Sequence, residues 1–144
     1  MEIASLYSQL VTNPAVSVKP EAIEAIALKA NTALLVYVRD SWVCGTALVC
    51  LCDDVMFNAQ PFAVVENVVI DAAVRGQGIG TTLFRSIEAY CHTNVCSKIM
   101  LLSAVARADA HRFFESVGYA GSSKRGFVKY RRDFSSPDPL QPWG

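Results

Sequence analysis

The stretch from residue 68 to residue 83 limits what this chain can fold into more than any other. It reads Val-Val-Ile-Asp-Ala-Ala-Val-Arg-Gly-Gln-Gly-Ile-Gly-Thr-Thr-Leu, which predicts a β-branched strand, a glycine-rich loop and the first turn of an amphipathic helix. The glycines at 76, 78 and 80 leave backbone N–H groups unshielded beside a helix N-terminus, which carries partial positive charge. Such an arrangement binds phosphate, so the stretch predicts a phosphate loop.

The glycine spacing excludes two common kinds of phosphate loop. A dinucleotide-binding G-x-G-x-x-G motif that starts at Gly76 would need glycine at the position of Thr81. A nucleoside triphosphate loop would need Gly-Lys-Ser/Thr, which does not follow. The spacing instead fits Arg-x-x-Gly-x-Gly, and a strand-to-helix turn without a ligand stays open as the alternative.

The length and composition indicate a single domain with one core. The chain has 144 residues, of which 52% are hydrophobic, and no apolar run reaches the roughly 18 residues that a membrane span needs. The N-terminus lacks the basic start and apolar block of a signal peptide. Five cysteines, an odd count without a C-x-x-C pair, suggest neither a disulfide framework nor a zinc site. We therefore expect reduced thiols and a cytoplasmic protein without a bound metal.

The charges are unevenly distributed, although the net charge is zero. Residues 1–74 hold 3 Lys/Arg and 8 Asp/Glu, a balance of 3 − 8 = −5, and residues 75–144 hold 10 and 5, a balance of +5. The basic half begins at the glycine loop, where it would attract a polyanion, while the acidic half would attract a cationic amine. Halves of globular domains often differ by a few charges, so an unspecific origin is the alternative.

Hydrophobic periodicity divides the chain into alternating elements. Helices are predicted over 2–12, 20–31 and 79 to about 92, and a short helix is predicted to start with Asp109 as its N-cap and to end at Gly118. Strands are predicted over 33–39, 42–52, 62–71, 98–104 and 127–134, followed by an extended tail over 135–144 that carries Trp143. The last strand interleaves basic and aromatic residues, which we interpret as an edge strand rather than a nucleic-acid surface.

Two polar residues interrupt the apolar strand that leads into the glycine loop. Glu66 and Asn67 lie between runs of valine, and a carboxylate there must face solvent or be stabilised by a partner. Burial there would raise the pKa of this carboxylate, which would make it a better base. A substrate-orienting or structural carboxylate is the alternative for Glu66.

Two motifs together resemble the GNAT superfamily of acyl-CoA-dependent N-acyltransferases. The first is Arg-Gly-Gln-Gly-Ile-Gly at 75–80, and the second is Ala-His-Arg-Phe-Phe-Glu-Ser-Val-Gly-Tyr at 110–119. The resemblance covers residues 62–130 well and the N-terminal part by its layout. It implies an α/β (α+β) fold over residues 1–134, with a mixed, largely antiparallel sheet of about six to seven strands and about four helices on both faces.

The resemblance also implies how the fold would hold its ligands. The fourth and fifth strands of the fold, here the Glu66 strand and the 98–104 strand, would splay apart and admit the pantetheine arm of acetyl-CoA. The first two helices would flank an acceptor that is a small primary amine or a protein amino group, and Glu66 would be the general base. No metal, nucleic acid or membrane partner is implied, and homodimers are common among small members. The implied cofactor-binding residues are Val68, Val69, Ile70, Arg75, Gly76, Gln77, Gly78, Ile79, Gly80, Thr81, Asp109 and Phe114.

The chain departs from the superfamily pattern at two of these residues. Phe114 stands where many members have a tyrosine that protonates the leaving thiolate, and Asp109 stands where many have asparagine. Water, Tyr119 or Tyr130 could supply the proton, or no acid is used, because a thiol has a low intrinsic pKa. His111 is a further candidate, with a helix-surface role as the alternative. These departures also favour a second interpretation, a regulatory module that binds acyl-CoA without efficient turnover.

Overall fold

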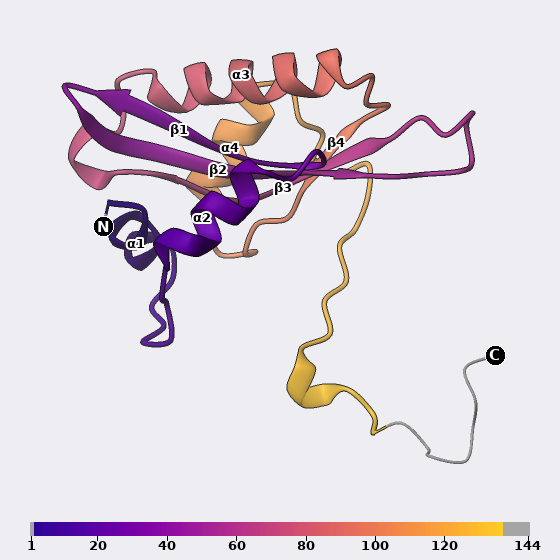
Figure 1. Cartoon of the computed structure of the whole chain (residues 1–144), viewed down its shortest axis with the longest axis horizontal. Helices are drawn as coiled ribbons and strands as arrows, with labels where there is room; N and C mark the ends of the chain where they lie inside the picture. Colours follow the sequence, from indigo (N-terminus) through magenta and orange to yellow (C-terminus); the bar gives the residue numbers. More distant parts are fainter. Residues whose placement is uncertain (1, 137–144) are drawn as a thin grey trace.

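The computed structural model describes residues 2–136. Two short helices come first, three long strands follow, and a long helix, a short strand and a fourth helix complete the domain (Figure 1). The bounds are α1 Glu2–Leu10, α2 Pro20–Ala27, β1 Thr32–Arg39, β2 Trp42–Cys52, β3 Phe62–Ile70, α3 Ile79–Thr93, β4 Ile99–Leu101 and α4 Ala108–Ser116, with 3-10 turns at Ala72–Val74 and Arg131–Asp133.

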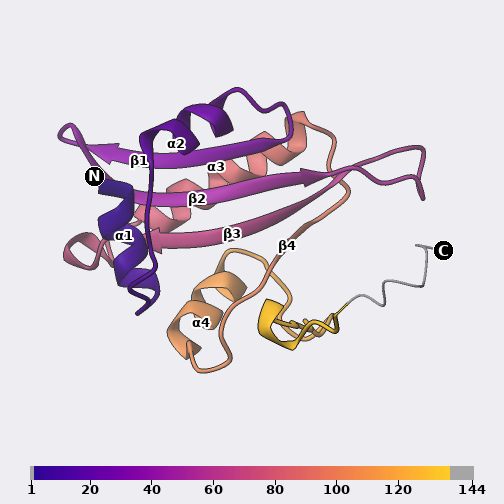
Figure 2. The ribbon, with the colours of Figure 1, turned by 60° about the horizontal axis from the view of Figure 1, so that its bottom comes forward.

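The four strands form one mixed sheet in the order β1-β2-β3-β4. The pairs β1–β2 and β2–β3 are antiparallel, whereas β3 and β4 are parallel and join through only three residue pairs, which end at Val65 and Leu101. A crossover through α3 connects β3 to β4, as parallel neighbours require. Figure 2 shows that β4 and the chain after it diverge from β3 toward the end of the sheet that carries the glycine loop.

Helices cover both faces of the sheet. On one face, buried residues of β2 and β3 pack against one side of α3, and α4 joins this layer through its aromatic residues. On the other face, α1 contacts β2 and β3 while α2 contacts β1 (Figures 1 and 2). The prediction of four helices around a mixed sheet is therefore confirmed. The main buried cluster consists of Ala47, Val49, Ala63, Val65, Leu83, Phe84, Ile87 and Cys91.

The predicted number of strands is wrong for the described residues, which hold four strands rather than six or seven. The strand predicted over 127–134 is an extended segment with a 3-10 turn, and Figure 1 shows it leaving the body of the domain. A strand is stable only beside a partner, and no neighbouring strand borders this segment among the described residues, so Phe127 remains 88% exposed.

Several predicted boundaries also need correction. The first two helices end earlier than expected, at Leu10 and Ala27, and β4 is three residues long instead of seven. β4 is short because the bulge of β3 just beyond Val65 ends the hydrogen bonding between the two strands. Within the described part of the chain, no helix is long and apolar enough to cross a membrane. The predicted tail lies mostly outside the described residues, and so does Trp143.

Candidate active site

The glycine loop connects β3 to α3 through a capped turn. The Asp71 side chain accepts a hydrogen bond from the Ala73 N–H at 2.8 Å and caps the 3-10 turn that precedes the glycines. Gly76 and Gly78 have φ angles of 76° and 81°, a left-handed conformation that L side chains rarely adopt. A Cβ at either position would meet nothing within 4 Å, so open space surrounds the loop backbone.

The N-terminus of α3 is available to an anion. Gly78 is its N-cap, and no side chain caps the helix. The first turn of a helix leaves N–H groups without intrahelical partners and carries partial positive charge. The side chain of Ile79 is buried, so Ile79 can offer a ligand its backbone rather than its side chain. The residues around Gly78 therefore fit a phosphate group through backbone N–H groups.

The polar side chains of the loop hold the loop in place. Gln77 accepts a hydrogen bond from the Arg39 guanidinium at 2.7 Å, which ties the loop to β1. Arg75 donates from Nε to the Ile70 carbonyl oxygen at 3.0 Å. These two predicted cofactor-binding residues thus have structural contacts, and a ligand would meet mainly backbone groups and the outer nitrogens of Arg75.

Gly80 has a packing role that the sequence pattern does not reveal. A Cβ at this position would lie 2.9 Å from the tip of the Phe113 ring, which is closer than real Cβ contacts allow. Because Gly80 has no side chain, Phe113 of α4 can pack directly against this turn of α3. Phe113 also contacts Phe84 of α3 edge-on, with ring centroids 5.5 Å apart.

A β-bulge places Glu66 and Asn67 together on the surface of β3. Thr46 pairs with Val69 but Leu48 pairs with Glu66, so β3 carries an extra residue between these pairs. Asn67 has a φ angle of 55°, and the side chains of Glu66 and Asn67 are both exposed. Glu66 has no ion-pair partner among the described residues, so of the two expected alternatives it faces solvent.

Helix α1 holds both ends of the bulged part of β3. Burial raises the pKa of Tyr7, and the nearby Asn67 side chain partly opposes that effect. Gln9 donates to Asp71 Oδ2 at 3.2 Å and accepts from the Ala72 N–H at 2.8 Å. The sequence analysis missed Tyr7 and Gln9, because contacts across about 60 residues leave no local pattern.

The edge of β3 that faces β4 becomes free after Val65. Pairing with β4 stops there although β3 continues to Ile70, so the predicted segment Val68–Ile70 lies beyond the last pair. The Ser103 hydroxyl, two residues past the end of β4, is buried and has no hydrogen-bond partner among the described residues. A buried polar group without a partner fits a place where a ligand supplies one.

Helix α4 differs from the prediction at its first turn. It begins at Ala108, its N-cap residue is Arg107, and Asp109 therefore lies inside the helix, where it forms an ion pair with Arg112. Asp109 is thus not the N-cap that the sequence suggested. Phe114 is half-buried among aromatic rings, with centroids 5.7 Å from Phe84 and 5.8 Å from Phe113.

The other predicted acids make contacts of their own elsewhere in the described chain. Tyr119 packs edge-on against Phe84 of α3, and burial raises its pKa to about 12. Tyr130 lies in the exposed C-terminal segment under the Arg132 guanidinium. His111 makes a 2.9 Å hydrogen bond to the Ala104 carbonyl oxygen, which secures the loop before α4. Tyr7 is the tyrosine that lies near the bulge.

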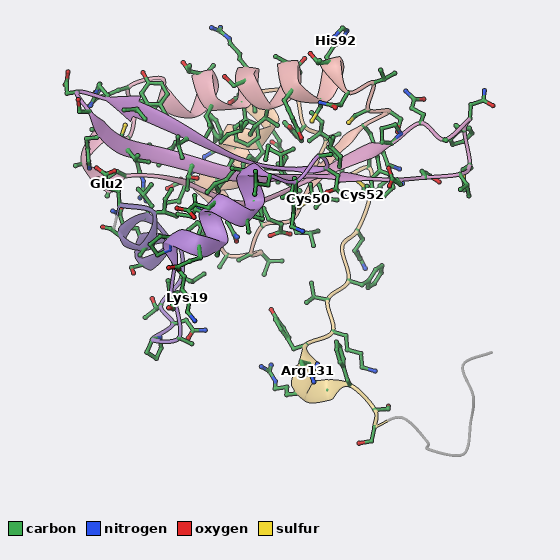
Figure 3. All side chains as sticks on the ribbon, in the orientation of Figure 1. Glu2, Lys19, Cys50, Cys52, His92 and Arg131 are labelled. Atoms are coloured by element: carbon green, nitrogen blue, oxygen red, sulfur yellow. The ribbon has the colours of Figure 1, made fainter. Side chains whose placement is uncertain are left out.

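The five cysteines are free thiols. Figure 3 shows Cys50 and Cys52 on β2, below the C-terminal part of α3, and His92 on the side of α3 that faces away from the sheet. Burial raises the pKa of Cys91 to about 12, so this thiol stays protonated at neutral pH. The described residues contain no group of three or more side chains that could hold a metal ion.

Comparison with known proteins identifies the family. Residues 3–119 match the family described as Acetyltransferase (GNAT) family. The chain belongs to the GNAT acetyltransferases. This family uses acetyl-CoA as its co-substrate, and its members are acyltransferases that act on amines.

Solved structures show the same fold. A proposed acetyltransferase from Agrobacterium tumefaciens str. C58 is similar over 90% of this chain and 92% of its own, with 27% identity and a TM-score of 0.81. Glucosamine-6-phosphate N-acetyltransferase from Arabidopsis thaliana is similar over 89% of this GNAT chain and 88% of its own length, with 22% identity and a TM-score of 0.75. An aminoglycoside acetyltransferase from an uncultured soil metagenomic sample covers 90% and 85%, with 14% identity and a TM-score of 0.79.

Proposed function

We propose that this GNAT chain is an N-acetyltransferase that moves an acetyl group from acetyl-CoA to a primary amine by direct attack in a ternary complex. One observation supports this most. The bulge that exposes the Glu66 carboxylate is followed, within the next fifteen residues, by two glycines in the left-handed conformation and a helix N-terminus without a side-chain cap. The glycines and the helix N-terminus suit a pyrophosphate, and the carboxylate suits an amine.

The residues of the chain would divide the work as follows. Acetyl-CoA supplies an acetyl group activated as a thioester. Backbone N–H groups of residues 76–81 would hold its pyrophosphate, and an N–H group of the free edge at 68–70 would donate to the thioester carbonyl oxygen. Asp109 and Phe114 on α4 would border the pantetheine region. Much of the rate would come from holding the amine and the thioester in line.

Glu66 would accept the proton of the incoming amine, directly or through water. Its carboxylate is exposed on the bulge and is not committed to an ion pair among the described residues, so it is free for this task. Phe114 cannot donate a proton to the departing sulfur. The low pKa of a thiol lets the thiolate leave without an acid.

The test is release of free CoA thiol from acetyl-CoA in the presence of a panel of primary amines. We expect turnover with at least one amine, and we expect Glu66→Gln to lower kcat by roughly 10²- to 10⁴-fold and to change its pH profile, because the amide cannot accept the proton. Glu88→Gln, on the exposed side of α3, is the matched control and should keep wild-type rates. An unchanged kcat and pH profile in Glu66→Gln would show that Glu66 is not the base.

A second candidate is a regulatory module that binds acyl-CoA without efficient turnover. The departures at Phe114 and Asp109 favour it, since Asp109 is engaged with Arg112 and Phe114 has no proton to give. Tight acetyl-CoA binding without thiol release for any amine, including a lysine-containing peptide as a protein acceptor, would support this candidate.

Two copies of the chain would pair through the C-terminal segment 127–134, and the protein would act in the cytoplasm. The support for pairing is a set of exposed apolar side chains in one short segment, Phe127, Val128, Tyr130 and Phe134. β4 is an edge strand with a free side, and such an edge accepts a further strand.

A further inference from the structure

A cavity of about 300 Å³ lies between the two N-terminal helices and the first strands of the sheet. Apolar side chains alone line it, among them Ile3 of α1, Ile23 and Ile26 of α2, and Leu34 and Val36 of β1. Val36 is 45% exposed, so the cavity wall reaches the surface. A cavity with an apolar lining binds apolar groups and excludes charged ones.

The pairing of the strands connects this cavity to the proposed base. Leu34 pairs with Leu48, and Leu48 pairs with Glu66. Residues directly opposite each other in antiparallel strands have their side chains on the same face of the sheet. Leu34, Leu48 and Glu66 therefore form one row, with the cavity at one end and the carboxylate about 10 Å away at the other, two strand spacings along.

Helix α1 also connects the cavity to the bulge of β3. Ile3 lines the cavity, and Tyr7, one helical turn later, lies near the side chain of Asn67, the residue after Glu66. The N-terminal half that contains these elements carries the excess of acidic residues, which attracts cations. A charged nitrogen would thus be drawn to this face while an apolar group is accepted by the cavity.

We propose that the acceptor is a primary amine with an aliphatic or aryl group, whose nitrogen lies at Glu66 and whose apolar group occupies the cavity bounded by α1, α2 and β1. This assignment rests on the proposed acetyltransferase function and names the substrate class for the same site. It excludes acceptors that are polar throughout, because their hydroxyl and charged groups would be buried without partners in the cavity.

The experiment compares n-octylamine with n-butylamine as acceptors for acetyl-CoA, with free CoA thiol as the readout. The extended octyl chain spans about 10 Å and reaches the cavity from Glu66, whereas the butyl chain spans about 5 Å and does not. Each methylene that enters the cavity should raise kcat/KM about fourfold. We expect octylamine to exceed butylamine at least tenfold, and equal kcat/KM values would overturn the proposal.

Two variants of α2 distinguish binding of the alkyl group in the cavity from a general preference for longer apolar amines. Ala27 lines the cavity and is exposed at the end of α2, so Ala27→Phe should block the cavity without disrupting the core. Ala25→Phe makes the same change at an exposed position of α2 outside the cavity lining. We expect Ala27→Phe to lose the octylamine advantage and to keep the butylamine rate, and Ala25→Phe to behave as wild type. Equal behaviour of the two variants would overturn the proposal.

Failure of the proposed function gives a different result. If no amine releases thiol, calorimetric titration of octylamine into the acetyl-CoA-saturated protein tests the cavity alone. Binding that Ala27→Phe removes and Ala25→Phe keeps would support the cavity as the apolar subsite of a chain without turnover. No octylamine binding to the wild-type protein would overturn the inference.

Discussion

At the residue scale, the backbone conformation of Asn67 determines how the candidate site is exposed. Its left-handed conformation lets Glu66 and Asn67 both reach the surface and ends the pairing of β3 with β4. A non-glycine residue in this conformation carries strain that its surroundings must offset. The interaction between Tyr7 of α1 and the Asn67 side chain is one such contribution.

Tyr7 and Asn67 should therefore be coupled in stability. Tyr7→Phe removes the hydroxyl that lies near Asn67 and is expected to lower the free energy of unfolding by about 1 kcal/mol, measured by urea denaturation. Asn67→Gly removes both the side chain that lies near Tyr7 and the backbone strain, so Tyr7→Phe should cost little in that background. Tyr37→Phe, away from the bulge, should add independently to Asn67→Gly. Strictly additive effects for Tyr7 and Asn67 would contradict this coupling.

At the scale of elements, the C-terminal end of α3 buries thiols against the sheet. Burial raises the pKa of Cys91 from its ordinary value of 9.0 to about 12, and the pKa values of Cys96 and Cys50 are raised in the same way. Between these pH values the unfolded chain releases the Cys91 proton and the folded chain keeps it. The unfolded state then binds fewer protons, so stability falls as pH rises.

We expect the free energy of unfolding to decrease above pH 9, with Cys91 contributing up to about 1.4 kcal/mol per pH unit. Cys91→Ala should remove that share of the decrease, although it lowers stability at pH 7 by creating a cavity. Urea denaturation at pH 7 and pH 10 measures both effects. Ile87→Val, a buried change without a titrating group, controls for the cavity. A slope that stays the same in Cys91→Ala would contradict the assignment.

Elements defined by local sequence were predicted well, and contacts across the chain were not. The strand, glycine loop and helix at 68–83 follow from neighbouring residues, because glycine spacing and hydrophobic period are local properties. The bulge at Asn67 and its contact with Tyr7 depend on the packing of α1 on β3, which no local pattern encodes. The strand expected at 127–134 has the right alternation but pairs with no strand in the described chain.

At the scale of the whole molecule, the C-terminal segment is one part where a single copy leaves several apolar side chains exposed. Light scattering should give twice the 15.7 kDa mass of one chain, because pairing would cover the apolar side chains of residues 127–134. Phe127→Ser combined with Tyr130→Ser should yield a monomer. The matched control is Val55→Ser with Phe57→Ser, which changes exposed apolar residues at the β2–β3 connection and should leave the dimer intact. A monomeric wild-type protein would contradict pairing.

Binding of acetyl-CoA is the property on which the rest of the proposed function depends. Its most direct measurement is calorimetric titration at low and high salt, with Gly78→Val as the loop variant and Gly121→Val as the control. We expect micromolar binding that weakens with salt, since phosphates meet partial positive charge at the surface. Gly78→Val should abolish binding, because valine cannot adopt the φ angle of 81°, while Gly121→Val should retain it. No detectable binding to the wild-type protein would mean that the glycine loop is structural, and it would contradict the proposed acetyl transfer.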